Sequence, residues 1–122
     1  MQKGERLRKE AEFSAVYAQG KTWSSGSIVL RALRNDLERN RYAFVAGRKV
    51  GKAVVRNRVK RRLREIARLT PTKQGWDLVF IARAGAGDVA YRDLDRSVKG
   101  LLRRAHILVD VDASAADGKV EA

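Results

Sequence analysis

Residues 53–69 constrain the fold most, because they combine an apolar stripe with a high density of positive charge. Val55, Val59, Leu63 and Ile66 recur at spacings of four, four and three residues, which places them on one face of an α-helix. Basic side chains occupy much of the remaining surface, at Arg56, Lys60, Arg61, Arg64 and Arg68. The pattern predicts a helix that lays its apolar face on a core and leaves its cations outside.

The positive charge is concentrated in this part of the sequence. The chain has 122 residues with 27 Lys and Arg, 14 Asp and Glu, and a formal net charge of +13. Residues 48–68 contain ten basic residues and one acidic residue, so this stretch alone has a net charge of +9. So dense a patch costs self-repulsion and is typical of a protein with a polyanionic partner. Nucleic acid is therefore the leading candidate, and a solvated charged face is the alternative.

Apolar patterning along the rest of the chain predicts a single α+β domain. Helices are expected at residues 10–18, 53–69 and 91–105, and strands at 21–24, 27–34, 41–47 and 77–82. Gly20 is the expected C′ residue of the first helix. Asn35 and Asp36 mark a turn, which makes 41–47 the returning strand of a hairpin with 27–34. The order predicts an α/β sandwich with a four-stranded, mainly antiparallel sheet in residues 1–109, followed by a disordered acidic tail at 110–122.

Several classes of protein are excluded by composition. The chain has no cysteine and only one histidine, His106, which excludes a disulfide scaffold, a thiolate zinc site and a multi-histidine metal site. No apolar stretch approaches the roughly 18 residues of a membrane span, and the charged N-terminus does not resemble a signal peptide. We therefore expect a soluble cytoplasmic protein without a membrane partner or a small-molecule substrate.

Acidic residues are too scattered to predict catalysis by the protein itself. Asp93 and Asp95 lie two positions apart on a predicted helix and so point to different faces. Glu65 is the only carboxylate in the basic segment, and we expect it to pair within the helix with Arg61, Arg62 or Arg68. No catalytic residue and no metal ligand is predicted in this chain.

The basic segment also carries a specific motif. It runs Arg48-Lys49-Val50-Gly51-Lys52-Ala53-Val54-Val55-Arg56-Asn57-Arg58-Val59-Lys60-Arg61, with Arg64 in place. This string resembles the signature of the protein subunit of bacterial ribonuclease P. The resemblance extends to Leu7-Arg8-Lys9, to Phe13 with Tyr17 and Gly20, and to residues 77–83, so it covers about residues 5–105.

The resemblance implies a ribonucleoprotein endonuclease that removes the 5′ leader from precursor tRNA. In that family the RNA subunit is the catalyst, and the protein binds both the catalytic RNA and the leader and raises the affinity for substrate and Mg²⁺. It therefore implies two partners, the catalytic RNA and precursor tRNA, with Mg²⁺ used by the RNA holoenzyme. It further implies a left-handed crossover around the basic helix, against the general preference for right-handed connections.

Two sets of site residues follow from the resemblance. The residues expected to bind the catalytic RNA are Arg48, Lys49, Lys52, Arg56, Asn57, Arg58, Lys60, Arg61, Arg64 and Arg68. Those expected in the leader-binding cleft are Phe13, Tyr17, Arg31 and Arg83. Aromatic rings beside cations can bind single-stranded RNA by stacking, although Phe13 could instead fill the core. Trp23 and Trp76 are expected to pack.

The sequence departs from the family pattern at two positions, and three alternative functions remain. Arg31 stands where the family commonly has an aromatic residue facing the cleft, and Ala84 where it often has a basic residue. The main alternative is a basic RNA-binding protein of ribosomal or RNA-assembly type. An independent nuclease is disfavoured by the scattered acidic residues, and a DNA-binding protein by the lack of a helix-turn-helix or zipper pattern.

Overall fold

The structure is a computed structural model that describes residues 6–109. The acidic tail predicted at 110–122 lies outside the described residues. Between residues 6 and 109, no helix combines the length and apolar character needed to cross a membrane.

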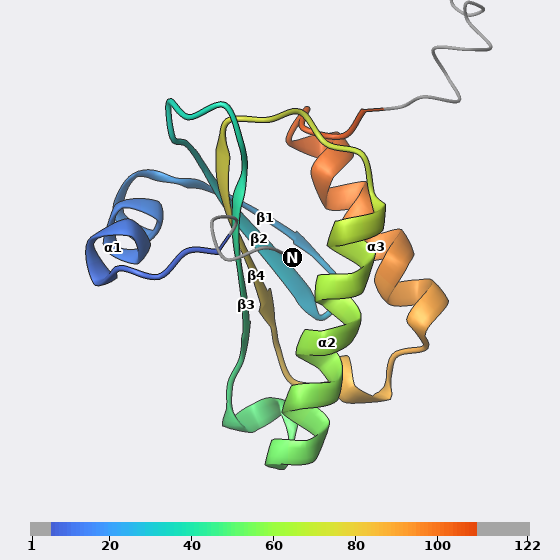
Figure 1. Cartoon of the computed structure of the whole chain (residues 1–122). Coiled ribbons are helices and arrows are strands. Elements are labelled where there is room, and N and C mark those ends of the chain that lie inside the picture. Colours follow the sequence, from blue (N-terminus) through green and yellow to red (C-terminus); the bar gives the residue numbers. More distant parts are fainter. Residues whose placement is uncertain (1–5, 110–122) are drawn as a thin grey trace, which may run out of the picture.

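Three helices and four strands make up the fold (Figure 1). In chain order they are α1 (Glu10–Gln19), β1 (Lys21–Ser25), β2 (Ile28–Arg34), β3 (Arg41–Ala46), α2 (Ala53–Leu69), β4 (Trp76–Ala82) and α3 (Tyr91–Arg104). Short 3₁₀ turns, η2 (Arg48–Val50) and η3 (Ala86–Asp88), precede α2 and α3. Every helix and strand predicted from the sequence is present, with boundaries that differ by at most one residue.

The strand order is β1-β2-β4-β3, so the predicted hairpin between β2 and β3 is wrong. β4 lies between these two strands, antiparallel to β2 and parallel to β3. Leu78, Val79 and Phe80 of β4 are all fully buried, which requires cover on both faces and a neighbour on both sides. The sheet therefore has two antiparallel pairs and one parallel pair, and α2 is the crossover between β3 and β4. The left-handedness of that crossover stays a prediction.

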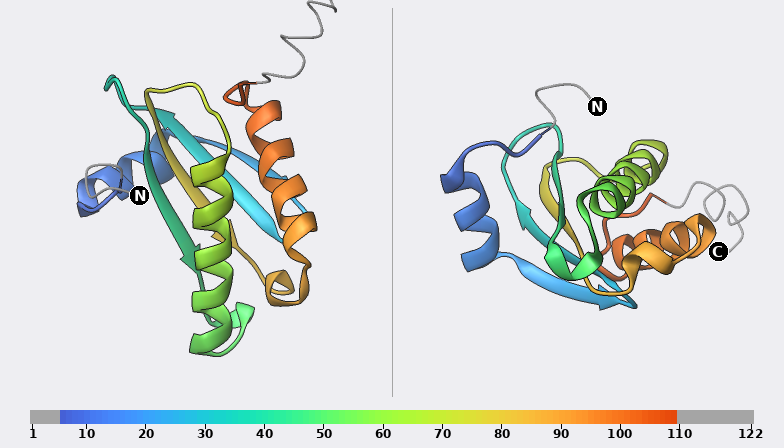
Figure 2. Two further views of the ribbon diagram at one scale, coloured as in Figure 1. Left: turned by 45° about the vertical axis from the view of Figure 1, so that its right-hand side comes forward. Right: turned by 90° about the horizontal axis from the view of Figure 1, so that it is seen from below.

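The main core lies between one face of the sheet and the two longer helices. α2 and α3 lie side by side over this face, while α1 lies on the opposite side of the sheet (Figure 2). Ile28, Leu30, Leu78 and Phe80 of the sheet meet the buried side chains of α2 and α3. Most buried positions of the helices are those that the periodicity predicts: Val59, Leu63 and Ile66 in α2, and Leu94, Val98, Leu101 and Leu102 in α3. Val55, predicted on the same stripe, is only half-buried, and Ala67 is buried as well. Trp23 and Trp76 pack against this core, as expected.

The opposite face of the sheet is only partly covered, by the short helix α1. Leu7 and Val16 are buried there against Ala43 and Val79. Gly20 ends α1 in an extended conformation with φ −73°, so the expected C′ role is wrong. The position needs glycine for a different reason, because a Cβ atom would lie 2.5 Å from the carbonyl oxygen of Val16.

Candidate nucleic-acid interface

The basic surface is built on α2, which the core holds in a fixed orientation. Val59 and Leu63 are fully buried and Ile66 is 1% exposed, so the helix cannot rotate without losing most of its apolar contacts. The predicted RNA-binding residues of α2 lie around the remaining surface: Asn57, Arg61 and Arg68 are exposed, and Arg56, Arg58, Lys60 and Arg64 are half-buried. Burial of one stripe therefore determines where all these side chains lie.

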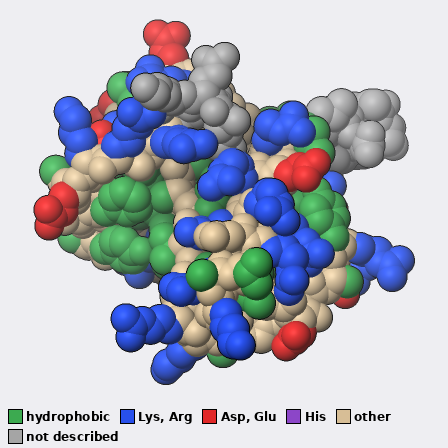
Figure 3. All heavy atoms as spheres, turned by 60° about the horizontal axis from the view of Figure 1, so that its bottom comes forward, with side chains coloured by type: hydrophobic (Ala, Val, Ile, Leu, Met, Phe, Trp, Pro, Cys, Tyr) green, Lys and Arg blue, Asp and Glu red, His purple; other side chains and the backbone are tan. Residues whose placement is uncertain are grey.

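Acids among residues 6–109 do not neutralise the cations of this surface. The ion pairs between described residues join Arg41 to Glu12 and Asp77, and two pairs on α3, and none uses a side chain of residues 48–68. Glu65 is exposed and makes no ion pair within residues 6–109, so its expected pairing inside α2 is wrong. Lys and Arg side chains crowd one face of the molecule, with few acidic ones between them (Figure 3). A field of this kind attracts a polyanion.

Two arginines of α2 also make contacts with other parts of the fold. Arg58 Nη2 donates a hydrogen bond of 3.3 Å to the carbonyl oxygen of Gly87 in the β4–α3 loop. The Arg64 guanidinium lies over the ring of Phe44, 5.7 Å from its centre. The Nε atoms of Arg56 and Arg58 are buried without a hydrogen-bond partner among the described residues. Arg58 is thus part of the protein scaffold as well as of the basic surface.

The loop before α2 presents Arg48, Lys49 and Lys52 at the surface. Val50, between them, is buried and fixes the loop to the core. Gly51 has φ +147°, a conformation that L side chains rarely adopt, and a Cβ atom there would lie 3.1 Å from the Val55 side chain. The loop conformation therefore depends on glycine at this position, which places three cations next to the first turn of the helix.

A second surface lies on the sheet face that α1 leaves open. A hollow of about 670 Å³ lies there, floored by apolar side chains including Val45 and Ile81. Arg48, Lys49 and Arg83 also line this hollow. Arg83 Nη2 donates to Ser24 Oγ at 3.2 Å, and Ala84 lines the same hollow without a charge. The structure thus brings a predicted cleft residue, Arg83, together with two residues of the basic loop.

The other predicted cleft residues lie together at α1. Tyr17 is 44% exposed, and the Arg31 guanidinium lies 5.0 Å from the centre of its ring and donates a hydrogen bond to its backbone carbonyl oxygen. Phe13 is half-buried and packs against the small core under α1, which supports its alternative role in packing. Val45 and Ile81 touch that same core and the hollow, so one apolar surface joins Phe13 to Arg83.

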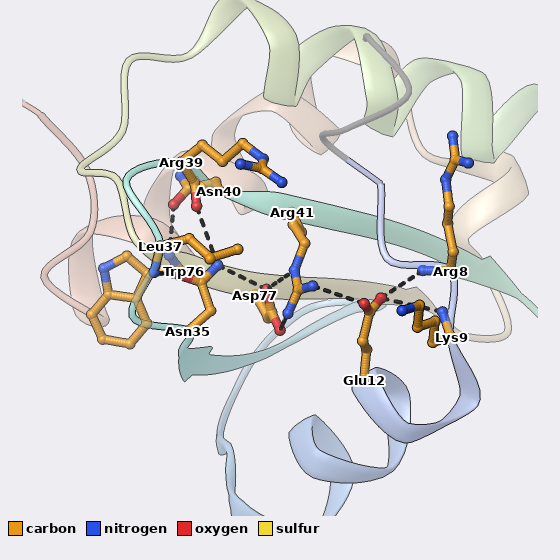
Figure 4. A network of polar contacts seen from close by, with 10 residues as sticks. All are labelled: Arg8, Lys9, Glu12, Asn35, Leu37, Arg39, Asn40, Arg41, Trp76 and Asp77. Atoms are coloured by element: carbon orange, nitrogen blue, oxygen red, sulfur yellow. Dashed lines mark hydrogen bonds and ion pairs between the residues drawn. The ribbon is translucent and has the colours of Figure 1, made fainter.

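A polar network, which the sequence analysis missed, fixes α1 to the sheet (Figure 4). Arg41 Nε and Nη2 donate to the two carboxylate oxygens of Asp77 at 2.8 and 2.7 Å, and Arg41 Nη1 donates to Glu12 Oε2 at 2.8 Å. Asn35 Nδ2 also donates to Asp77, at 2.9 Å. Asp77 is 3% exposed. The sequence contained one signal of this network, the acidic residue Asp77 at the start of an apolar run. A carboxylate buried in such a strand requires a partner.

The same network shifts the pKa values of two of its members. Backbone N–H donation from Arg8 is the main cause that lowers the pKa of Glu12 below 4.5, with further help from Lys9 and Arg41 against the effect of burial. Hydrogen bonding to Asp77 raises the pKa of Arg41 above its ordinary value. Both groups are therefore ionised wherever the protein is folded near neutral pH.

Metal ligands are not grouped in the described part of the chain. Within residues 6–109, no three His, Asp or Glu side chains lie close enough together to hold a metal ion. The arrangement that the structure does offer is a basic helix and loop beside an apolar hollow with a cationic rim. This combination can bind a sugar–phosphate backbone and unstacked bases.

Comparison with known proteins identifies the family. Residues 1–106 match the family model described as Ribonuclease P. The ribonuclease P protein component of Dehalococcoides mccartyi strain CBDB1 is 47% identical over 112 residues, which cover 92% of this chain and 93% of that protein. The corresponding protein of Clostridioides difficile strain 630 is 38% identical and covers 84% and 93%.

Solved structures agree with the sequence comparison. The RNase P protein from Thermotoga maritima superposes with a TM-score of 0.72 at 31% identity, covering 82% of this chain and 96% of that one. A Staphylococcus aureus RNase P protein mutant with defective mRNA degradation activity gives a TM-score of 0.81 at 27% identity, covering 87% and 92%. The α+β fold is therefore that of a known class of proteins, the ribonuclease P proteins. The chain belongs to the family of bacterial ribonuclease P protein components.

Proposed function

We propose that this chain is the protein subunit of a ribonuclease P in which it binds the catalytic RNA through α2 and the loop before it. The observation that carries the proposal is the un-neutralised basic surface of residues 48–68 on a helix whose orientation the core fixes. Phosphate contacts supply affinity without reading sequence, so this surface suits a folded RNA of defined shape.

The 5′ leader of precursor tRNA is assigned to the face on the α1 side of the sheet. Tyr17 and Arg31 offer a ring and a guanidinium at one end, and Arg83, Arg48 and Lys49 offer cations around the hollow at the other. An extended single strand could lie along this face with bases on the apolar floor and phosphates at its rim. The protein would then raise the affinity for substrates that carry a leader.

Catalysis is assigned to the RNA subunit. The interface presents guanidinium and ammonium groups, and its only carboxylate is Glu65. Such a donor set does not fit Mg²⁺, which prefers oxygen ligands, so we assign the Mg²⁺ of the holoenzyme to its RNA. The site of action would be the cytoplasm, where precursor tRNA is made.

Reconstitution tests the proposed function. The purified protein is mixed with a bacterial ribonuclease P RNA and a precursor tRNA at low Mg²⁺, where the RNA alone has little activity, and each component alone is the control. We expect accurate release of the 5′ leader only from the mixture. Binding to the RNA without stimulated cleavage would instead favour a ribosomal or assembly role, and cleavage by the protein alone would favour an independent nuclease.

A further inference from the structure

At the β3 edge of the sheet, two neighbouring hollows, together called the groove below, lie between the two surfaces described above. β3 is the last strand in the sheet, and residue Leu7 donates a backbone hydrogen bond of 2.9 Å to Tyr42 on its outer side. On either side of this crossing the surface is hollowed. One hollow of about 210 Å³ is lined by Arg6, Phe13, Phe44 and Arg64, and another of about 290 Å³ by Arg68, Thr72 and Gln74, and Tyr42 lines both.

The described residues that line this groove bring charge of one sign. Among residues 6–109, Arg6, Arg64 and Arg68 are the charged residues that line the two hollows, and no acidic side chain of this range lines either. Arg64 and Arg68 are four residues apart on α2, so they lie on one side of the helix about one turn apart. This side of α2 faces β3, and it continues the basic surface of the helix around the edge of the sheet.

The walls of the groove offer contacts that suit a nucleotide. The larger hollow is mostly polar, with the Tyr42 hydroxyl 3.3 Å from Thr72 Oγ1, and Gln74 accepting a hydrogen bond of 3.1 Å from the Asn40 backbone N–H. The smaller hollow has aromatic walls in Phe13 and Phe44, with the Arg64 guanidinium over the Phe44 ring. Cations at the rim and rings in the wall are the combination found where single-stranded RNA binds.

We infer that this groove binds the sugar–phosphate backbone of an RNA strand that passes around the β3 edge from α2 toward the α1 side of the sheet. Phe13 and Ala43, which line the smaller hollow, belong to that side, whereas Arg64 belongs to α2. The groove therefore links the surface assigned to the catalytic RNA with the surface assigned to the leader. Arg6 becomes an RNA contact that the motif does not contain, and the inference rests on the proposed function.

Removal of one charge tests the groove against a matched control. Arg6→Gln removes an exposed cation at the groove and keeps the backbone contact to β3, and Arg103→Gln removes an exposed cation on α3. Binding of each full-length variant to a bacterial ribonuclease P RNA is measured across a salt series. We expect Arg6→Gln to weaken binding about fivefold near 0.1 M salt and to flatten the salt dependence by about one phosphate contact. Arg103→Gln should change neither value. No effect of Arg6→Gln, or an equal effect of both variants, would overturn the inference.

Directed cleavage gives a second, independent test. The chain has no cysteine, so Gln74→Cys and Arg103→Cys each provide a single attachment point for an iron chelate. Hydroxyl radicals generated at residue 74 should cut a short segment of the bound RNA, and those at residue 103 should leave that segment intact. A complex that forms and stimulates leader removal, yet shows no cut from residue 74, contradicts the groove while the proposed function stands. A wild-type protein that neither binds nor stimulates contradicts the proposed function itself.

Discussion

Arg56 and Arg58 lie two residues apart in the motif, yet their surroundings differ. Arg58 donates to the carbonyl oxygen of Gly87 and so holds the β4–α3 loop against α2, whereas Arg56 makes no hydrogen bond through its side chain within the described residues. Arg56 therefore contributes only to the basic surface, whereas Arg58 contributes to that surface and also holds the fold together.

Substitution of the two arginines should separate these roles. We expect Arg56→Ala to weaken binding to the catalytic RNA and to flatten the salt dependence by about one phosphate contact, with little change in stability. Arg58→Ala should also lower the free energy of unfolding by about 0.5–1.5 kcal/mol, because it loses a hydrogen bond to the backbone. Denaturant unfolding and RNA titrations measure the two effects. Equal stability of the two variants would show that the contact with Gly87 is dispensable.

Tyr17 is a sharper test of the leader face than Phe13, because Phe13 also packs in the core. Tyr17→Ala should weaken binding of precursor tRNA with a leader more than binding of mature tRNA, since it removes the exposed ring that Arg31 overlies. Tyr91→Ala, which removes another exposed tyrosine from α3, is the control. If Tyr17→Ala weakens both RNAs equally, the ring does not contact the leader.

At the scale of elements, α1 depends on a few polar contacts because it has little apolar surface to bury. Val16 is its only fully covered side chain, and the Glu12–Arg41–Asp77 network adds to the packing of Phe13 and to the contacts of Arg31 with Tyr17. The helix that carries Tyr17 is therefore placed by a charge network with partners in β3 and β4.

Breaking this network should cost far more than breaking an exposed ion pair. Arg41→Met leaves Asp77 buried without its charged partner, and we expect a loss of about 3–5 kcal/mol in the free energy of unfolding. Arg96→Met breaks the exposed pair with Asp93, for which less than about 1 kcal/mol is expected. Thermal or denaturant unfolding of both variants provides the comparison, and a loss below about 1 kcal/mol for Arg41→Met would contradict the role given to the network.

Glu12 should make the attachment of α1 sensitive to acid. Its pKa is lower in the folded chain than its ordinary value of 4.5, so the unfolded chain binds the proton more readily. The stabilisation is therefore complete above pH 4.5 and is lost as the pH falls through the lower folded value. The difference in stability between wild type and Glu12→Gln should be constant near neutral pH and shrink below 4.5. A difference that grows on acidification would have the wrong sign for this contact.

At the scale of the whole molecule, the sequence predicted the elements well and their neighbours less well. The helices follow from a periodicity within each segment, so Val59, Leu63 and Ile66 could be placed in the core from spacing alone. The position of β4 between β2 and β3 depends on pairing across 36 residues or more of chain, which no local pattern encodes. Arg41 and Asp77 lie 36 residues apart, so their bond was hidden for the same reason.

The parts of the candidate site also differ in how far the sequence could predict them. The basic residues of α2 could be located because a motif and a helical face coincide in one segment. The hollow beside α1 and the groove at β3 could not, because each is assembled from residues of several strands and loops. Arg6 belongs to no motif, and only its position against β3 gives it a role.

The central position of β4 also has a consequence for the order in which the protein is made. β2 and β3 leave the ribosome early, but the strand that joins them ends at Ala82. Until then Val29 and Leu30 lack the neighbour that covers them in the finished sheet. The nascent chain must therefore carry β3 without its partner, and β2 with only β1 beside it, through the synthesis of the whole of α2. The four-stranded sheet can form only when about two thirds of the chain has been translated.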